Sequence, residues 1–217
     1  MLSEAEKKKD VYRVLKKSID YILSKNESLI NNNKIDINAL ALKLGVKDIQ
    51  EVTPDEMKRI KDEFYNKHAC LFGNTIFLNN EDSREKQRFS VAHEIFHHIS
   101  REENEMQAVA RQGEVWKKEN EGSTKAYVET VADYFAANLL IPTESFILFD
   151  DKTDEEIALI FNVEEKCIKK RRTEIEQEIT LLEPVNLASD LIPEEKTPLT
   201  LDEINDVFEG YNSDRQA

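Results

Sequence analysis

Three of the four histidines in this 217-residue sequence lie between residues 93 and 98. His93 and His97 are four residues apart, and residues at that spacing project from one face of a helix, where their imidazoles can bind one tetrahedral metal ion. Glu94 would lie beside such an ion rather than on it, in position to accept a proton from a water molecule. The spacing therefore predicts a metal-binding helix with Glu94 as its general base.

The surrounding sequence supports a helix at this place. A β-branched and aromatic segment at 74–79 predicts a strand, and Asp82 with Glu85 predicts a capped helix over about 83–99. If His93 and His97 were instead ordinary core or surface residues, their clustering would have no explanation.

A second helix, predicted over about 126–140 and stopped at Pro142, offers a third ligand. Catalytic zinc sites usually have three protein ligands, and Glu129 and Asp133 share one face of this helix. Glu129 can bind the metal while Asp133 accepts the N–H of a ligand histidine. Helix periodicity alone fits equally well with two acids on a solvated face.

Elsewhere the apolar pattern predicts three upstream helices and a helical hairpin over about 154–177, joined at 161–163. Residues 101–125 are charged and weakly periodic, which favours a loop, and residues 181–217 form an acidic, proline-containing tail that we expect to be extended. The upstream helices are expected at 3–25 (with a capping box at Ser3), 35–44 and 55–65.

Composition narrows the possible partners and location. The formal net charge of −14 argues against broad nucleic-acid affinity, because like charges repel the phosphate backbone. No apolar run approaches the roughly 18 residues that span a bilayer, and the charged N-terminus predicts no signal peptide. Cys70 and Cys167 lie far apart in the sequence and are expected to be reduced and buried, so we expect a cytoplasmic protein with no membrane partner.

The predicted hairpin carries four consecutive bases, Lys169 to Arg172, and superficially reads as a helix-turn-helix. Glutamates at 155, 156, 164 and 165 surround these bases and would repel phosphate. We therefore expect this hairpin to pack on the core rather than to bind DNA.

Together, Arg88-Phe-Ser-Val-Ala-His-Glu-x-x-His97 and Glu129-x-x-Ala-Asp133-x-Phe-Ala-x-x-Leu-Leu-x-Pro142 resemble the ImmA/IrrE-type metallopeptidases. The resemblance covers about residues 35–175, including a similar helical lead-in. It implies an α+β fold: a mostly helical, zincin-like metallopeptidase domain with a small β-sheet, over about 31–180. An N-terminal helix (1–30) precedes this domain and the tail follows it.

By position, the resemblance implies that His93, His97 and Glu129 hold Zn²⁺ and that Glu94 is the catalytic glutamate. Characterised relatives of this type cleave helix-turn-helix repressors and so release stress or mobile-element genes. The expected partner is therefore a protein substrate of that kind. One departure is Phe96, where a small glycine is usual, so the packing around the helix must leave more room.

Peptide hydrolysis also needs a donor for the oxyanion, and the sequence leaves four candidates unranked: Tyr127, Tyr134, His98 and Arg88. His98 is expected to be a packing or surface residue rather than a fourth ligand. We expect the strand at 74–79 to present a free edge to an extended substrate. Two rival functions stay open: a non-catalytic antirepressor or toxin that binds a regulator, and a helical DNA-binding regulator.

Overall fold

The computed structural model describes the backbone of residues 4–102 and 124–182, and the side chains of 11–101 and 128–176. The chain divides into two units, residues 1–181 and 182–217, and the description below concerns the first. The predicted cap at Ser3, most of the predicted loop at 101–125, and the tail beyond Leu182 lie outside the described residues.

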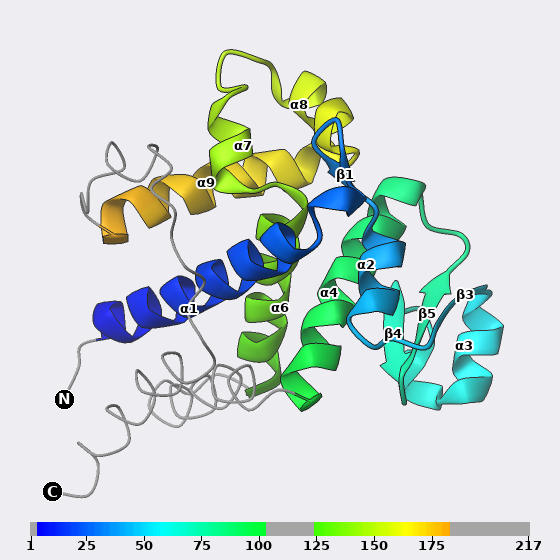
Figure 1. Cartoon of the computed structure of the whole chain (residues 1–217). Coiled ribbons are helices and arrows are strands. Elements are labelled where there is room, and N and C mark those ends of the chain that lie inside the picture. The colour runs from blue at the N-terminus through cyan, green and yellow to red at the C-terminus, as the bar shows by residue number, and fades with distance from the viewer. Residues whose placement is uncertain (1–3, 103–123, 183–217) are drawn as a thin grey trace, which may run out of the picture. The chain divides into compact units, whose positions relative to one another are not determined.

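The described fold is α+β and mostly helical with small sheets, as predicted (Figure 1). Helix α4, which carries the histidines, packs against α6 and also contacts α2 and strands β4 and β5. The helices are α1 (Glu4–Lys25), α2 (Ile37–Lys43), α3 (Pro54–Ile60), α4 (Arg84–Glu102), α6 (Thr124–Leu140), α7 (Thr143–Ile147), α8 (Asp154–Phe161) and α9 (Glu165–Leu182). The strands are β1 (Ile30–Asn31), β2 (Lys34–Ile35), β3 (Asp48–Val52), β4 (Ala69–Phe72) and β5 (Thr75–Asn79).

The main sheet has the strand order β3-β5-β4, with β3 parallel and β4 antiparallel to β5. The predicted strand at 74–79 is therefore present as β5, but the prediction that it offers a free edge is wrong. Strands β3 and β4 pair on its two sides, and neither was predicted, since β3 is polar and β4 has only four residues. Within the described residues, a free edge belongs to β4 or β3.

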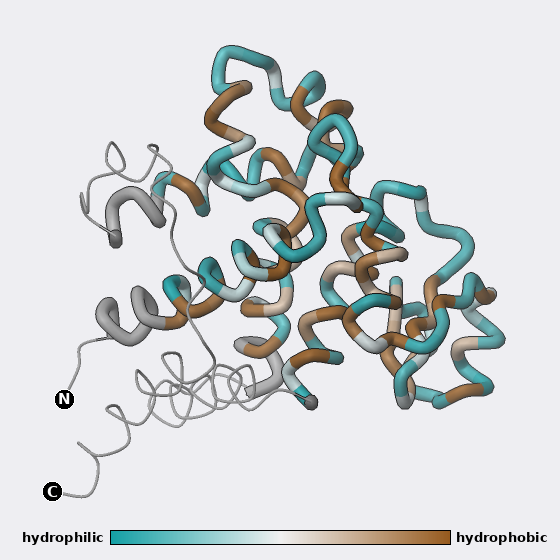
Figure 2. Tube along the Cα trace, viewed as in Figure 1, coloured by the Kyte–Doolittle hydropathy of each residue, from teal (hydrophilic) through white to brown (hydrophobic). Residues whose placement is uncertain are grey.

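Helix α1 contributes one apolar face to the core. Val11, Leu15, Ile19 and Ile22, the residues that the periodicity placed on one face, are all buried in the main hydrophobic cluster. This helix packs against α6, where the rings of Tyr12 and Tyr134 lie 4.4 Å apart. Figure 2 shows hydrophobic segments recurring along α6 and α4. Buried hydrophobic residues of both helices belong to one cluster, and their burial holds the two helices in place.

The short helix α2 has well-defined ends. The side chain of Asp36 accepts a hydrogen bond from the Ala39 N–H at its start. Gly45 follows its end with φ +98°, and a Cβ there would lie 3.1 Å from Nε2 of His98. Glycine is required for both reasons, because an L side chain would be strained and would press on α4.

Two other helix ends differ from the prediction. The third helix was expected to reach residue 65, but α3 ends at Ile60 because Lys61 is extended, with φ −160°. A 3₁₀ turn, η2 (Asp62–Phe64), follows. At α4 the cap is Ser83, whose hydroxyl accepts from the Lys86 N–H at 3.2 Å, whereas Asp82 pairs with His68 and Lys86. No helix among the described residues is both long and apolar enough to span a bilayer.

Candidate metal centre

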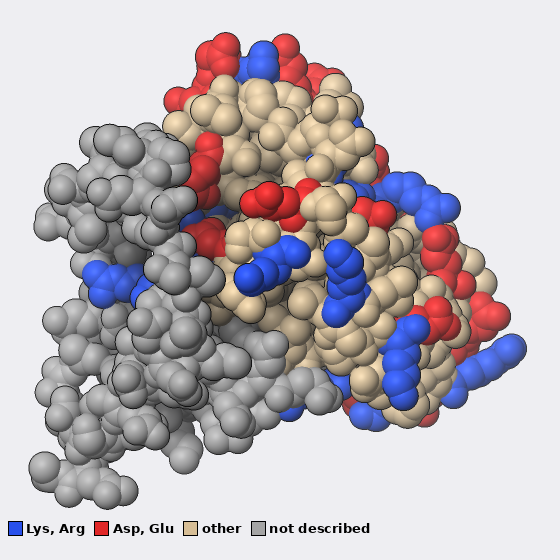
Figure 3. All heavy atoms as spheres, in the orientation of Figure 1, with Lys and Arg blue, Asp and Glu red and all other residues tan. Residues whose placement is uncertain are grey.

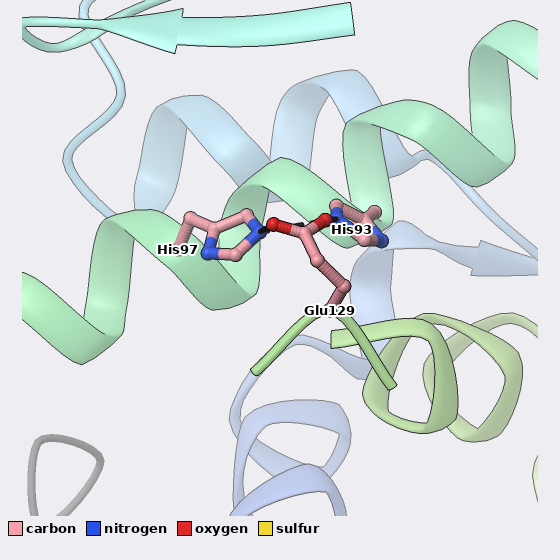
Figure 4. Close-up of side chains that lie close together, drawn as sticks. All are labelled: His93, His97 and Glu129. Atoms are coloured by element: carbon pink, nitrogen blue, oxygen red, sulfur yellow. Dashed lines mark hydrogen bonds and ion pairs between the residues drawn. The ribbon is translucent and has the colours of Figure 1, made fainter. Parts of the chain in front are cut away.

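Helices α4 and α6 bring the three predicted ligands together (Figure 4). Nε2 of His93 lies 3.1 Å from Nε2 of His97 and 3.1 Å from a carboxylate oxygen of Glu129. The other Glu129 oxygen lies 3.8 Å from Nε2 of His97. The Glu129 carboxylate thus lies between the two imidazole rings (Figure 4), and one ligand atom from each residue lies within 4.8 Å of the other two.

These distances fit a tetrahedral metal ion. Two nitrogens bound to zinc at about 2.0–2.1 Å with a tetrahedral angle are about 3.3 Å apart, close to the 3.1 Å between the two Nε2 atoms. Two imidazole lone pairs and a carboxylate that face one another also repel unless a cation or a proton lies among them. The donor set of two imidazoles and one carboxylate is one that zinc prefers, so these residues could hold that metal.

Asp133 orients the His93 ring from the side away from the cluster. Its Oδ1 lies 2.9 Å from Nδ1 of His93, so Nδ1–H donates and Nε2 faces the cluster. Burial would lower the pKa of His93, but the hydrogen bonds to Asp133 and Glu129 outweigh it and raise the pKa to about 9. Hydrogen bonds to His93 and His97 hold the pKa of the Glu129 carboxyl well below its usual range.

Glu94 lies on α4 next to His93 but outside the cluster of ligand atoms. Its side chain is buried, with 8% of the residue exposed. Burial raises the pKa of this carboxyl, and the charges of His97 and His93 offset part of that effect. A carboxylate of raised pKa is a stronger base, which suits the role predicted for Glu94.

Three of the four candidate oxyanion donors are engaged elsewhere. Arg88 donates from Nε to the Asn162 carbonyl and from Nη1 to the Ile35 carbonyl, each at 3.1 Å. Nε2 of His98 lies 3.1 Å from the Leu44 carbonyl, so His98 ties α4 to the end of α2, as expected of a packing residue. Tyr134 is buried against α1. The side chain of the fourth candidate, Tyr127, lies outside the described residues.

Phe96, the departure from the family pattern, fills the space between α4 and α6. Its side chain is fully buried, and its ring lies 5.6 Å from the ring of Phe135 on α6. The ring also meets His97 edge-on at 5.8 Å, with an interplanar angle of 68°. A phenylalanine here therefore supports the rotamer of His97, and both histidines remain in the cluster.

Two lysines near the cluster were not predicted. Lys67, just before β4, is close enough to Glu94 for its charge to lower the pKa of that carboxyl. Lys170 on α9 places its ammonium 3.2 Å from Oδ2 of Asp133. Lys170 belongs to the run of bases at 169–172, but its contact with Asp133, like the place of Lys67 near Glu94, depends on the packing of distant segments.

The bases on α9 are engaged by the protein rather than gathered on a surface. Lys169 pairs with Glu165, and Lys170 with Asp133. Arg171 is fully buried at the end of α6, while Arg172 pairs with two aspartates around the start of α8. On the face drawn in Figure 3, lysines and arginines are scattered among acidic and other residues over the described surface. The hairpin α8–α9 packs on the core, as expected.

Comparison with known proteins identifies the family. Residues 41–173 match the peptidase M78 family, described as the IrrE N-terminal-like domain. A search of curated proteins found no match. The matched region contains both histidines, both site glutamates and Asp133, and it extends over more than half of the sequence. The chain therefore belongs to the peptidase M78 family, with an IrrE N-terminal-like domain.

Proposed function

We propose that this protein is a zinc-dependent endopeptidase that cleaves a regulatory protein at a specific site. The observation that carries the proposal is the convergence of His93, His97 and Glu129 on one point, with the buried carboxyl of Glu94 adjacent on the same helix. Membership of a peptidase family supports a metallopeptidase-type role.

Each residue has a role that follows from its position. Zinc held by the three ligands would acidify a water molecule and polarise the peptide carbonyl. Glu94 would accept a proton from the attacking water and pass it to the leaving amine, and its burial strengthens it as a base. Asp133 keeps the proton of His93 on Nδ1, so that Nε2 is available as a ligand.

The substrate we propose is a helix-turn-helix transcriptional repressor, cleaved as part of a stress or mobile-element switch. The resemblance of the two motifs to ImmA/IrrE-type peptidases supports this class. Strand β4 adds a physical argument: its outer edge is free within the described residues, and β4 contacts α4. An extended segment of a substrate can pair with such an edge and so lie beside the site helix.

The proposal is tested with Glu94→Gln and the matched control Glu85→Gln, which alters a glutamate in the first turn of the same helix. Both variants should bind zinc like the wild type. Incubated with a candidate helix-turn-helix repressor as substrate, wild type and Glu85→Gln should each give one discrete product by mass spectrometry. Glu94→Gln should be slower by about 10²–10⁴-fold, the usual contribution of a general base.

The alternative function is a non-catalytic antirepressor or toxin that binds a regulator without cleaving it. In that case wild type and Glu94→Gln would relieve repression equally, with the repressor intact. That result would reject the peptidase proposal, whereas a cleaved product that depends on Glu94 would reject the alternative.

A further inference from the structure

The basic run on α9 makes one contact that points toward the candidate metal centre. Nζ of Lys170 lies 3.2 Å from Oδ2 of Asp133, and Oδ1 of the same carboxylate lies 2.9 Å from Nδ1 of His93. The two oxygens of Asp133 thus face different partners. A chain of contacts runs from α9 through α6 to a ligand histidine on α4.

The neighbouring Arg171 fixes the position of Lys170. Its guanidinium, fully buried, donates to the Ile141 carbonyl at 3.1 Å, to Oγ1 of Thr143 at 2.6 Å and to the side-chain oxygen of Asn138. These acceptors lie at the end of α6 and the start of α7. Arg171 holds α9 against the end of α6. Because Lys170 precedes Arg171 in the sequence, this packing keeps Lys170 within reach of Asp133.

The contact of Lys170 with Asp133 is the shorter of its two ion pairs. Its ammonium lies 4.0 Å from Glu174 on its own helix, compared with 3.2 Å from Asp133. A carboxylate that only accepted from His93 could rotate about its side-chain torsions, and a second bond to its other oxygen restricts that rotation.

We propose that Lys170 is a positioning residue that holds Asp133 in the orientation in which it accepts the Nδ1 proton of His93, and so strengthens metal binding at Nε2. The inference rests on the proposed zinc site. It assigns to the C-terminal hairpin a part in metal binding, in addition to its packing on the core.

The competing interpretation is an ordinary surface ion pair. The side chains of Lys170 and Asp133 are 48% and 39% exposed, and exposed pairs often contribute little. An effect on metal affinity distinguishes the two interpretations, because a pair without a positioning role leaves that affinity unchanged.

The test compares Lys170→Met with Lys169→Met in the full chain. Both changes remove one positive charge from the same helix, but Lys169 pairs with Glu165 at 2.7 Å. We expect Lys170→Met to weaken zinc binding about threefold, within the range of exposed ion pairs, in competition with a chromogenic chelator. Lys169→Met should match the wild type. Lys170→Arg keeps the charge and should restore most of the affinity.

A double-mutant cycle identifies the route of the effect. Asp133→Asn should weaken zinc binding by about 10–100-fold, and adding Lys170→Met to it should cause no further loss if Lys170 acts through Asp133. The visible spectrum of the cobalt-substituted protein should change in Lys170→Met and not in Lys169→Met.

The inference is overturned if wild type and Lys170→Met bind zinc with the same affinity, or if the losses from Lys170→Met and Asp133→Asn simply add. Failure of the wild type itself to bind zinc would instead contradict the proposed function. The two failures are therefore separate results of one titration.

Discussion

The facing helices α4 and α6 and the hairpin α8–α9 both carry clusters of charged side chains, but they arrange them in opposite ways. On α4 and α6, the groups of His93, His97 and Glu129 converge on one point. On α9, the four bases from Lys169 to Arg172 diverge to separate partners on α9 itself, on α6 and around α8. Both clusters are ion-pair networks, yet only the first leaves lone pairs facing one another.

The difference distinguishes a binding site from a set of structural contacts. We call the second set, formed by Lys169 to Arg172 and their partners, the α9 clamp. Converging donors repel until a cation lies among them, so their energy depends on a ligand. Each diverging base is instead paired with a group of the protein itself. It therefore contributes to the stability of the fold and is not available to bind phosphate. A run of bases in the sequence is therefore weak evidence for nucleic-acid binding until the partner of each base is known.

Replacing Arg171 should disrupt the α9 clamp and cause the largest loss of stability. Arg171→Met removes a fully buried cation whose Nη1 lies 3.6 Å from Glu174. It also removes the hydrogen bonds that this guanidinium donates to groups at the end of α6. We expect the free energy of unfolding to fall by about 3–5 kcal/mol, because partners of a buried charge are left uncompensated. Urea denaturation measures this loss. Lys169→Met is the control, and an equal shift of the unfolding midpoint in both variants would contradict the clamp.

Replacing His97 should greatly weaken metal binding at the converging site. His97→Ala removes a ligand, so zinc affinity should fall by more than about 100-fold, beyond the loss expected for an outer partner such as Asp133. The adjacent His98→Ala should keep zinc affinity. It should lose about 1–3 kcal/mol of stability, because the Leu44 carbonyl loses its buried donor. If both variants lost zinc equally, the assignment of the ligands would be wrong.

The metal-free protein should become less stable in mildly alkaline solution. Folding raises the pKa of His93 from 6.5 to about 9, since bonds to Asp133 and Glu129 outweigh its burial. The folded chain therefore binds this proton more tightly, and the resulting stability is fully present below about pH 6.5 and lost as the pH rises through 9.

We expect a loss of about 3 kcal/mol between those pH values, measured by urea denaturation in the presence of a chelator. His93→Gln should lack this dependence, and so should the zinc-loaded protein, in which the metal takes the place of the proton at Nε2. The same slope in all three proteins would show that another group titrates.

The site helices were predictable because their signals are local. The spacing of His93 and His97 and the apolar period around them specify α4, and Pro142 correctly predicted the end of α6. The strands β3 and β4 were not predictable, since a short apolar run and a polar edge strand have no clear period. For that reason the free edge was assigned to β5, which is the central strand.

The less predictable parts of the site depend on packing between distant segments. Periodicity could not decide whether Glu129 faces solvent or a metal, because an exposed face and a ligand face have the same spacing. The contact of Lys170 with Asp133 joins residues 37 positions apart and depends on how α9 packs on α6. The cap of α4 at Ser83 rather than Asp82 shows a one-residue uncertainty typical of helix starts.

Zinc K-edge X-ray absorption of the zinc-loaded protein tests the converging site most directly. The geometry of His93, His97 and Glu129 predicts two imidazole nitrogens at about 2.0–2.1 Å, with oxygen ligands at about 2.0–2.2 Å completing the coordination. No sulfur should be present, because the buried thiols of Cys70 and Cys167 lie outside the cluster. A zinc–sulfur distance of about 2.3 Å, or fewer than two imidazoles, would contradict the site.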